Sequence, residues 1–240
     1  IYPLSPTQEG ILFQHLMSDD DTYTLQYVMD INGEVDISVL EAAWQWLAER
    51  HPILRTGFFW DAVAGPVQYV VPEATCSWQV IAHSGGSMQH ERLMHDDRSR
   101  TFDLATPALT RFTLLSRDWQ THKLIWTYHH ILLDGWCVAK VIKELFALYD
   151  QMIAGVQPEP VFSRVYRDYI EWLANQHERE KRPFWRRYLA GVSPTLFSSP
   201  VAYQPSSQAD HNVYRFNLGR DLSDGIERFC SGLGVTVAVL

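Results

Sequence analysis

The sequence has little of what marks nucleic-acid-binding, membrane-spanning or disulfide-rich proteins. Its 240 residues carry 20 Lys and Arg against 28 Asp and Glu, and no basic stripe offers the concentrated positive charge that nucleic acids require. No apolar run approaches the length needed to cross a bilayer. The three cysteines have no C-x-x-C spacing, which gives no structural zinc signature and favours a reducing cytoplasm over a disulfide scaffold.

The composition is instead that of a protein with a large core. Hydrophobic residues make up 46% of the chain and aromatic residues 13%, which is ample for a core. The length allows one large domain or two small ones. No internal repeat or low-complexity linker divides it. The chain lacks an initiator Met and ends on the apolar stretch "VTVAVL", without a cap or turn. We therefore expect it to be a piece of a longer protein.

Hydrophobic periodicity predicts an α/β sandwich, in which helices pack on a sheet. Helices are expected at 36–50, 87–99, 138–153, 162–175, 178–190 and 223–234. Strands are expected at 23–32, 54–60, 67–71, 108–115, 122–131 and 213–218, with a polar connection at 193–209. Ser38 and Glu41 have capping-box spacing for the first helix, and the segment 122–131 is apolar at odd and even positions, as in a central strand.

The stretch "YHHILLDGWC" (128–137) joins that central strand to the next helix. Because side chains alternate along a strand, His129 and His130 should point to opposite faces, which is poor geometry for binding one metal. Asp134 can cap the helix, and Gly135 allows the backbone to approach a ligand closely. A histidine four residues before an aspartate can exchange protons near neutral pH. Two buried core histidines and a plain helix cap fit this spacing equally well.

Four motifs together resemble the condensation domains of nonribosomal peptide synthetases. "HHILLDG" (129–135) looks like the HHxxxDG motif of that family. "YPLSPTQEGILF" (2–13), "RHPILRTGF" (50–58) and "YRDYIEWL" (166–173) are similar to its first, second and fourth core motifs, in the same order and spacing.

The resemblance implies a chloramphenicol-acetyltransferase-like sandwich, with a mixed sheet and helices packed on it. The complete family domain consists of two such lobes that face each other in a V, with the HHxxxDG loop in a tunnel between them. Residues 1–175 would be the N-terminal lobe, and residues 176–240 the connection and incomplete start of the C-terminal lobe. The isolated chain is expected to be inactive.

The implied reaction is amide bond formation between a peptidyl thioester on an upstream carrier protein and an aminoacyl thioester on a downstream carrier. No cofactor is expected in the chain itself, because the 4′-phosphopantetheine arms belong to the carriers. The missing C-terminal lobe and an adenylation domain are the other implied partners, with no membrane or nucleic acid.

The resemblance also implies residue roles. His130 would position the amine and assist proton transfer, and the Gly135 amide would contact the oxyanion. His129 would be a scaffold residue, and Asp134 would form a structural salt bridge with Arg55.

Other residues have less certain assignments from the pattern alone. Trp136 either lines the tunnel or belongs to the core. The helical spacing of Tyr166, Tyr169 and Trp172 predicts core packing. Three residues of the first motif are expected to be architectural: Ser5, Gln8 and Glu9.

Related functions remain as alternatives. The intact motif argues against heterocyclisation, epimerisation and recruitment domains, which alter it. A CoA-dependent acyltransferase of the same superfamily and a non-catalytic carrier-docking module both stay open. Within the family, the motifs favour the subtype that receives a D-configured or achiral donor residue.

Overall fold

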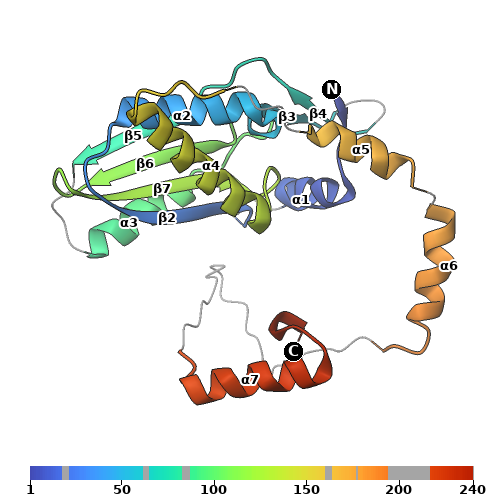
Figure 1. Cartoon of the computed structure of the whole chain (residues 1–240). Helices are drawn as coiled ribbons and strands as arrows, with labels where there is room; N and C mark the ends of the chain where they lie inside the picture. The colour runs from blue at the N-terminus through green and yellow to red at the C-terminus, as the bar shows by residue number, and fades with distance from the viewer. Residues whose placement is uncertain are drawn as a thin grey trace. The chain divides into compact units, whose positions relative to one another are not determined.

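The computed structural model describes residues 1–17, 22–61, 65–82, 87–159, 164–176, 178–193 and 217–239 (Figure 1). The chain divides into two compact units, residues 1–181 and 182–240. The first unit holds both sheets and the residues of the candidate site. The predicted strand at 213–218 and the connection at 193–209 lie almost wholly outside the described residues.

The larger sheet has four strands in the order β2-β7-β6-β5. These strands are β2 (Thr24–Asn32), β5 (Ser77–Ala82), β6 (Thr110–Ser116) and β7 (Thr121–His129). β7 runs antiparallel to both of its neighbours, whereas β5 and β6 are parallel. The sheet is therefore mixed, as expected, and β7 is a central strand that is almost wholly buried.

A smaller antiparallel sheet has the strand order β1-β4-β3. It consists of β1 (Tyr2–Pro3), β3 (Thr56–Phe59) and β4 (Val67–Val70). The predicted pairing of the segments around 54–60 and 67–71 is confirmed. The first of these segments begins in a 3-10 helix, η1 (Pro52–Arg55), because Pro52 sets the backbone for a turn rather than a ladder.

The six predicted helices are present, and α1 is a further helix that was not predicted. They are α1 (Pro6–Met17), α2 (Ile37–Arg50), α3 (Ser87–Arg98), α4 (Gly135–Ile153), α5 (Tyr166–Ala174), α6 (Glu178–Tyr188) and α7 (Arg220–Leu233), followed by the 3-10 helix η2 (Val237–Val239). The prediction of a capping box at Ser38 and Glu41 is wrong. Asp36 caps α2 instead, and its carboxylate accepts from the backbone N–H of Val39 at 3.1 Å. As predicted, the last helix ends near Gly234, which adopts the left-handed conformation with φ 67°.

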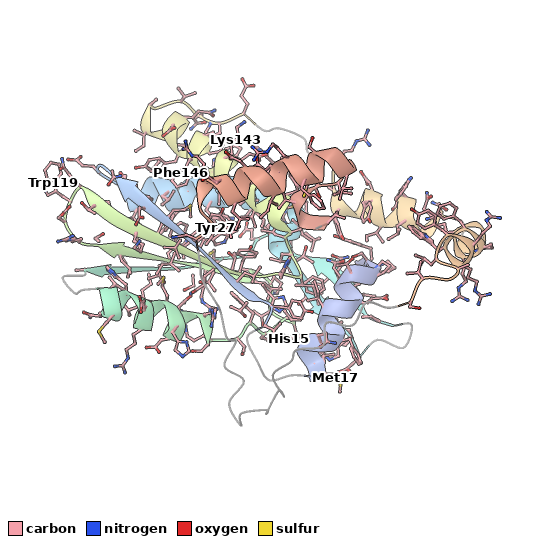
Figure 2. All side chains as sticks on the ribbon, turned by 90° about the horizontal axis from the view of Figure 1, so that it is seen from below. His15, Met17, Tyr27, Trp119, Lys143 and Phe146 are labelled. Carbon is pink, nitrogen blue, oxygen red and sulfur yellow. The ribbon has the colours of Figure 1, made fainter. Side chains whose placement is uncertain are left out.

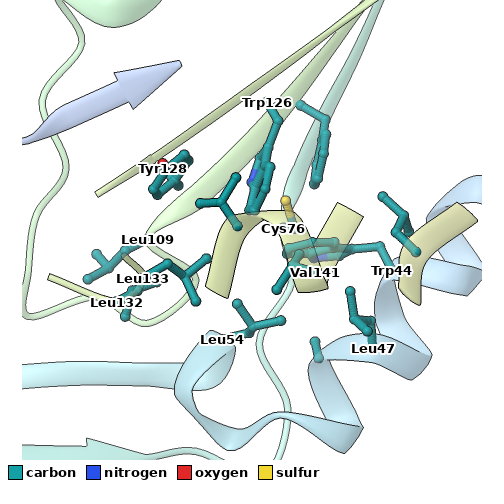
Figure 3. Packing of buried hydrophobic residues seen from close by; sticks show 14 of the residues in the cluster. Trp44, Leu47, Leu54, Cys76, Leu109, Trp126, Tyr128, Leu132, Leu133 and Val141 are labelled. Atoms are coloured by element: carbon teal, nitrogen blue, oxygen red, sulfur yellow. The ribbon is translucent and has the colours of Figure 1, made fainter. Parts of the chain in front are cut away.

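One face of the large sheet packs against α2 and α4 (Figure 1). Figure 3 shows the core between them, built around the indole of Trp126. The ring of Trp44, on α2, lies 4.8 Å edge-on from Phe112 and 5.8 Å from Trp126. Trp126 donates its indole N–H to the hydroxyl of Thr110 at 2.6 Å, so this buried polar group is satisfied.

The opposite face of the sheet carries a buried ion pair under α3 that the sequence patterns did not indicate. Asp97, near the end of α3, accepts from the guanidinium of Arg111 on β6 at 2.9 Å. It also accepts from Thr127 on β7 and from the amide of Gln26 on β2. Burial alone would raise the pKa of Asp97, but the hydrogen bonds from Thr127, Arg100 and Arg111 hold it below its usual value. A single carboxylate thus ties α3 to three strands.

Candidate active site

The loop between β7 and α4 is short and tightly held. The backbone N–H of His130 donates to the carbonyl of Tyr23 at 2.8 Å, and that of Leu132 donates to the carbonyl of His129 at 3.2 Å. The aliphatic side chains that follow His130 are buried. The strand therefore stops at His129, and the next residue leaves the sheet in a fixed direction.

His129 is a buried scaffold residue in this structure. It is 1% exposed, and its Nδ1 accepts from the backbone N–H of Ile131 at 3.2 Å. The ring of His15, which Figure 2 labels on α1, lies edge-on to the ring of His129 at 5.1 Å. The ring of Tyr23 lies at 6.2 Å. Burial above all, and then the neighbouring imidazoles of His15 and His130, lower the pKa of His129 to about 3. The ring is therefore neutral at physiological pH.

His130 lies on the wall of a pocket of about 410 Å³. The pocket is lined by Ser5, Thr7, Gln8, Ile11, His130, Ile131, Leu132, Leu133, Asp134, Cys137, Tyr166 and Tyr169. The Nδ1 atom of His130 is buried and has no hydrogen-bond partner in the part of the chain that the structure describes. The structure thus separates the two adjacent imidazoles, one in the core and one at a cavity.

Asp134 is the N-cap of α4. Its carboxylate accepts from the backbone N–H of Cys137 at 2.8 Å. The hydrogen bonds with Cys137 hold the pKa of Asp134 below its usual value, and they outweigh the opposing effect of burial. Gly135 follows as the first residue of the helix, and a Cβ built there would meet nothing within 4 Å. The first residue of this helix therefore faces open space rather than a packed neighbour.

The predicted salt bridge between Asp134 and Arg55 is wrong. The guanidinium of Arg55 donates to backbone carbonyls instead: that of Ala48 at 2.8 Å, that of Pro72 at 3.0 Å and that of Val71. These bonds tie the end of α2 to the segment after β4. Arg55 is therefore a structural residue with carbonyl partners, while the carboxylate of Asp134 serves as the helix cap.

Trp136 and two of the three aromatic residues of α5 are exposed, whereas Tyr166 is half-buried. Trp136 is 89% exposed, which excludes a core role for it in this unit. On α5, Tyr169 and Trp172 are 46% and 55% exposed, and Ile170 is the buried residue of that helix. The prediction of core packing is therefore wrong for Tyr169 and Trp172. The rings of Tyr166 and Tyr169 lie 5.6 Å apart, and both residues line the pocket.

The contribution of Gln8 to this site was not anticipated. Ser5 and Gln8 form a capping box at the start of α1: the Ser5 N–H donates to Gln8 Oε1 at 3.0 Å, and the Gln8 N–H donates to Ser5 Oγ at 3.2 Å. The three-residue spacing is visible in the sequence. The bond from Gln8 Nε2 to the carbonyl of Ile131, 123 residues away, is not.

Neither a metal-binding cluster nor a membrane-spanning helix is found among the described residues. They contain no group of three or more His, Cys, Asp and Glu side chains placed to hold a metal ion. None of the helices in the described segments combines the length and the apolar character of a membrane span.

Comparison with known proteins gives consistent matches. A family model described as the condensation domain matches residues 1–240. Bacitracin synthase 3 of Bacillus licheniformis is 35% identical over 249 residues, which cover 99% of this chain and 4% of that protein. A linear gramicidin synthase of Brevibacillus parabrevis is 37% identical over 250 residues, which cover 99% of this chain and 5% of that protein. The chain thus spans a small part of the length of these relatives.

Solved structures share the fold. The starter condensation domain of rhizomide synthetase RzmA has a TM-score of 0.70 at 22% identity, covering 81% of this chain and 51% of that one. The SgcC5 protein from Streptomyces globisporus has a TM-score of 0.73 at 18% identity, covering 98% and 56%. The chain spans about half the length of these structures. The expected chloramphenicol-acetyltransferase-like α/β fold with a mixed sheet is confirmed.

Proposed function

The chain belongs to the condensation domain family of peptide synthetases, and from this we propose that it forms part of a catalyst of peptide bond formation between two carrier-bound thioesters. The observation that carries the proposal is the placement of His130 in a pocket at the end of the central strand, while its neighbour His129 is locked in the core. Strand ends next to helix N-termini are where α/β folds position their chemistry.

The reaction makes modest demands on the protein. The acceptor amine forms a C–N bond with the donor thioester carbonyl, the C–S bond breaks, the amine loses a proton and the leaving thiolate gains one. A thioester is already activated, so orientation can supply much of the rate. A group that binds the amine and relays its proton completes the requirement.

His130 fits positioning better than it fits a strong base. A base at Nε2 must carry its own proton on Nδ1, and the buried Nδ1 has no acceptor for it among the described residues. The alternative tautomer presents an Nε2–H donor to the pocket. We therefore assign His130 to hydrogen bonding with the reacting groups, with proton transfer assisted from that position.

The backbone N–H of Gly135 is a second candidate for contact with the reacting atoms. Its amide is one of the free N–H groups at the start of α4, where the helix dipole favours negative charge. The open space around its Cα allows a substrate oxygen to approach without meeting a side chain. This supports its assignment as an oxyanion contact.

The substrates are carrier-bound in this proposal. The upstream carrier brings the peptidyl donor and the downstream carrier the aminoacyl acceptor, each on a 4′-phosphopantetheine arm that enters as part of the substrate. A starter condensation domain of similar fold has been solved in complex with C8-CoA and Leu-SNAC, an acyl and an aminoacyl thioester. The downstream adenylation domain is a further partner, as expected for a segment of large synthetases.

Residues 1–175 are assigned to the N-terminal lobe and residues 176–240 to the start of the C-terminal lobe. A tunnel with one wall missing would admit water and bind neither arm well, so the isolated chain should be inactive. Product formation by these 240 residues with two loaded carriers would contradict this assignment.

The test is a single-turnover condensation assay on the complete domain with both carriers loaded. His130→Ala should slow product formation by about 10²–10⁴-fold. His95→Ala, which removes an exposed imidazole on α3, is the matched control and should leave the rate unchanged. Undiminished product from His130→Ala would overturn the proposal. Replacing the donor carrier by acyl-CoA tests the acyltransferase alternative, because a clear preference for acyl-CoA over the carrier-bound donor would favour it.

A further inference from the structure

Both backbone polar groups of Ile131, the residue after His130, are held by side chains. On one side, the N–H of Ile131 donates to Nδ1 of His129 at 3.2 Å. On the other, the carbonyl of Ile131 accepts from Nε2 of Gln8 at 3.3 Å. Two side chains from different elements, β7 and α1, therefore fix the backbone immediately after His130.

Gln8 is itself held without freedom to rotate. Its Oε1 accepts from the N–H of Ser5 at 3.0 Å and from Nε2 of Gln68 at 2.9 Å. Its Nε2 donates to Oε1 of Gln68 at 3.2 Å as well as to Ile131. The carboxamide thus makes all four of the hydrogen bonds that it can form. Gln68, on β4, also donates to the carbonyl of Pro3 at 3.0 Å, so the pair is anchored in the small sheet.

The orientation of His130 depends on this backbone. The Nδ1 of its ring has no partner in the described chain, so no side chain holds that edge of the ring in place. The direction of its Cα–Cβ bond is set by the loop backbone. That backbone is held by the N–H of His130, which donates to Tyr23, and by the N–H and carbonyl of Ile131. A shift of about 1 Å at a reacting group can cost about 10²-fold in rate.

We propose that Gln8 is a positioning residue for the reaction: it holds the carbonyl of Ile131 so that the loop directs the ring of His130 into the pocket. This inference rests on the proposed role of His130. It assigns to the first motif a function in catalysis in addition to its place in the architecture. Gln8 acts through the backbone and is not itself in contact with the scissile bond.

The test compares two glutamines that each bridge separate elements. Gln8→Met keeps the length of the side chain and removes every hydrogen bond of the carboxamide. Gln26→Met does the same at a site under α3, where Gln26 donates to Asp97, Thr127 and the carbonyl of Met94. Both should lower the stability of the domain, but only Gln8 touches the loop.

In the condensation assay on the complete domain, Gln8→Met should lower kcat by about 10–100-fold with KM changed less than about twofold. The pH profile should keep its shape, because the ionising groups are unchanged. Gln26→Met should keep kcat within about twofold at a similar loss of stability. Equal kcat losses in both variants would show that Gln8 is architectural only and would overturn the inference.

A second variant, Gln8→Glu, tests the inference if the Gln8→Met domain does not fold. Gln8→Glu retains oxygen acceptors for Ser5 and for the amide of Gln68 but, when ionised, has no donor for the Ile131 carbonyl. It should show the same loss of kcat, and normal kcat would contradict the inference. His130→Ala is measured in parallel. If His130→Ala retains activity, the proposed function fails. If His130→Ala is inactive while both Gln8 variants keep normal kcat, only the role of Gln8 fails.

Discussion

Lowering the pH should destabilise this domain through His129. Burial lowers the pKa of this side chain from 6.5 to about 3 in the folded protein, whereas the unfolded chain has the ordinary value of about 6.5. Because the folded pKa is the lower one, the unfolded chain binds a proton that the folded chain does not. The stability is therefore fully present above about pH 6.5 and is lost progressively as the pH falls towards 3.

The size of the effect follows from one proton. Between about pH 7.5 and about pH 5, protonation of His129 in the unfolded chain alone should lower the free energy of unfolding by about 2 kcal/mol. Other groups also titrate in this range, so the diagnostic quantity is the difference between variants. His129→Asn offers an oxygen near the position of Nδ1 for the N–H of Ile131 but cannot take up a proton in this range.

The assay is urea unfolding of the complete domain at several pH values, followed by tryptophan fluorescence. The unmodified protein should lose about 2 kcal/mol more than His129→Asn over this interval. His95→Asn, on the exposed surface of α3, controls for the loss of one imidazole. Equal pH dependence in the unmodified protein and in His129→Asn would refute the argument that burial keeps this ring neutral.

Three further predictions concern stability and the start of α4. Asp97→Ala should lower the free energy of unfolding in urea by about 3–5 kcal/mol, because it leaves the charge of Arg111 buried without its carboxylate partner. Asp96→Ala, on the exposed side of α3, should lower it by less than about 0.5 kcal/mol. Similar losses in the two variants would contradict the buried pair. Asp134→Ala should cost about 1 kcal/mol and Asp134→Asn only a few tenths, because asparagine also caps helices; equal losses would point to charge rather than capping. Gly135→Ala should leave thermal unfolding nearly unchanged, because the added methyl group would meet no neighbour. If the Gly135 amide contacts the oxyanion as proposed, the same methyl group should slow condensation about tenfold; an unaltered rate would remove Gly135 from the site.

Local patterns were enough for most of the secondary structure. The central strand was predicted from apolar residues at both parities, and β7 is buried on both faces. The cap of α4 was predicted from Asp134 in front of an apolar helix, and the carboxylate makes that bond. These features depend on residues within a few positions of each other, whose interactions follow from backbone geometry alone. The four motifs likewise identified the family, which the comparisons confirm.

Partners distant in the sequence were decided by the tertiary structure. Periodicity placed Tyr169 and Trp172 on one helical face but could not say whether another element covers it, and that face is largely exposed. Arg55 required partners, and a carboxylate was expected, yet backbone carbonyls satisfy it. A guanidinium accepts either kind of oxygen as a partner, so its chemistry alone does not choose between them.

The division of the two histidines shows both contributions together. Alternation along the strand, a property of the sequence, separates His129 from His130. Only the packing of α1 and β4 against the end of β7 brings Gln8 to the Ile131 carbonyl. That contact joins residues 123 positions apart. No local rule relates them, because their distance is set by how the sheets and helices pack and not by the chain between them.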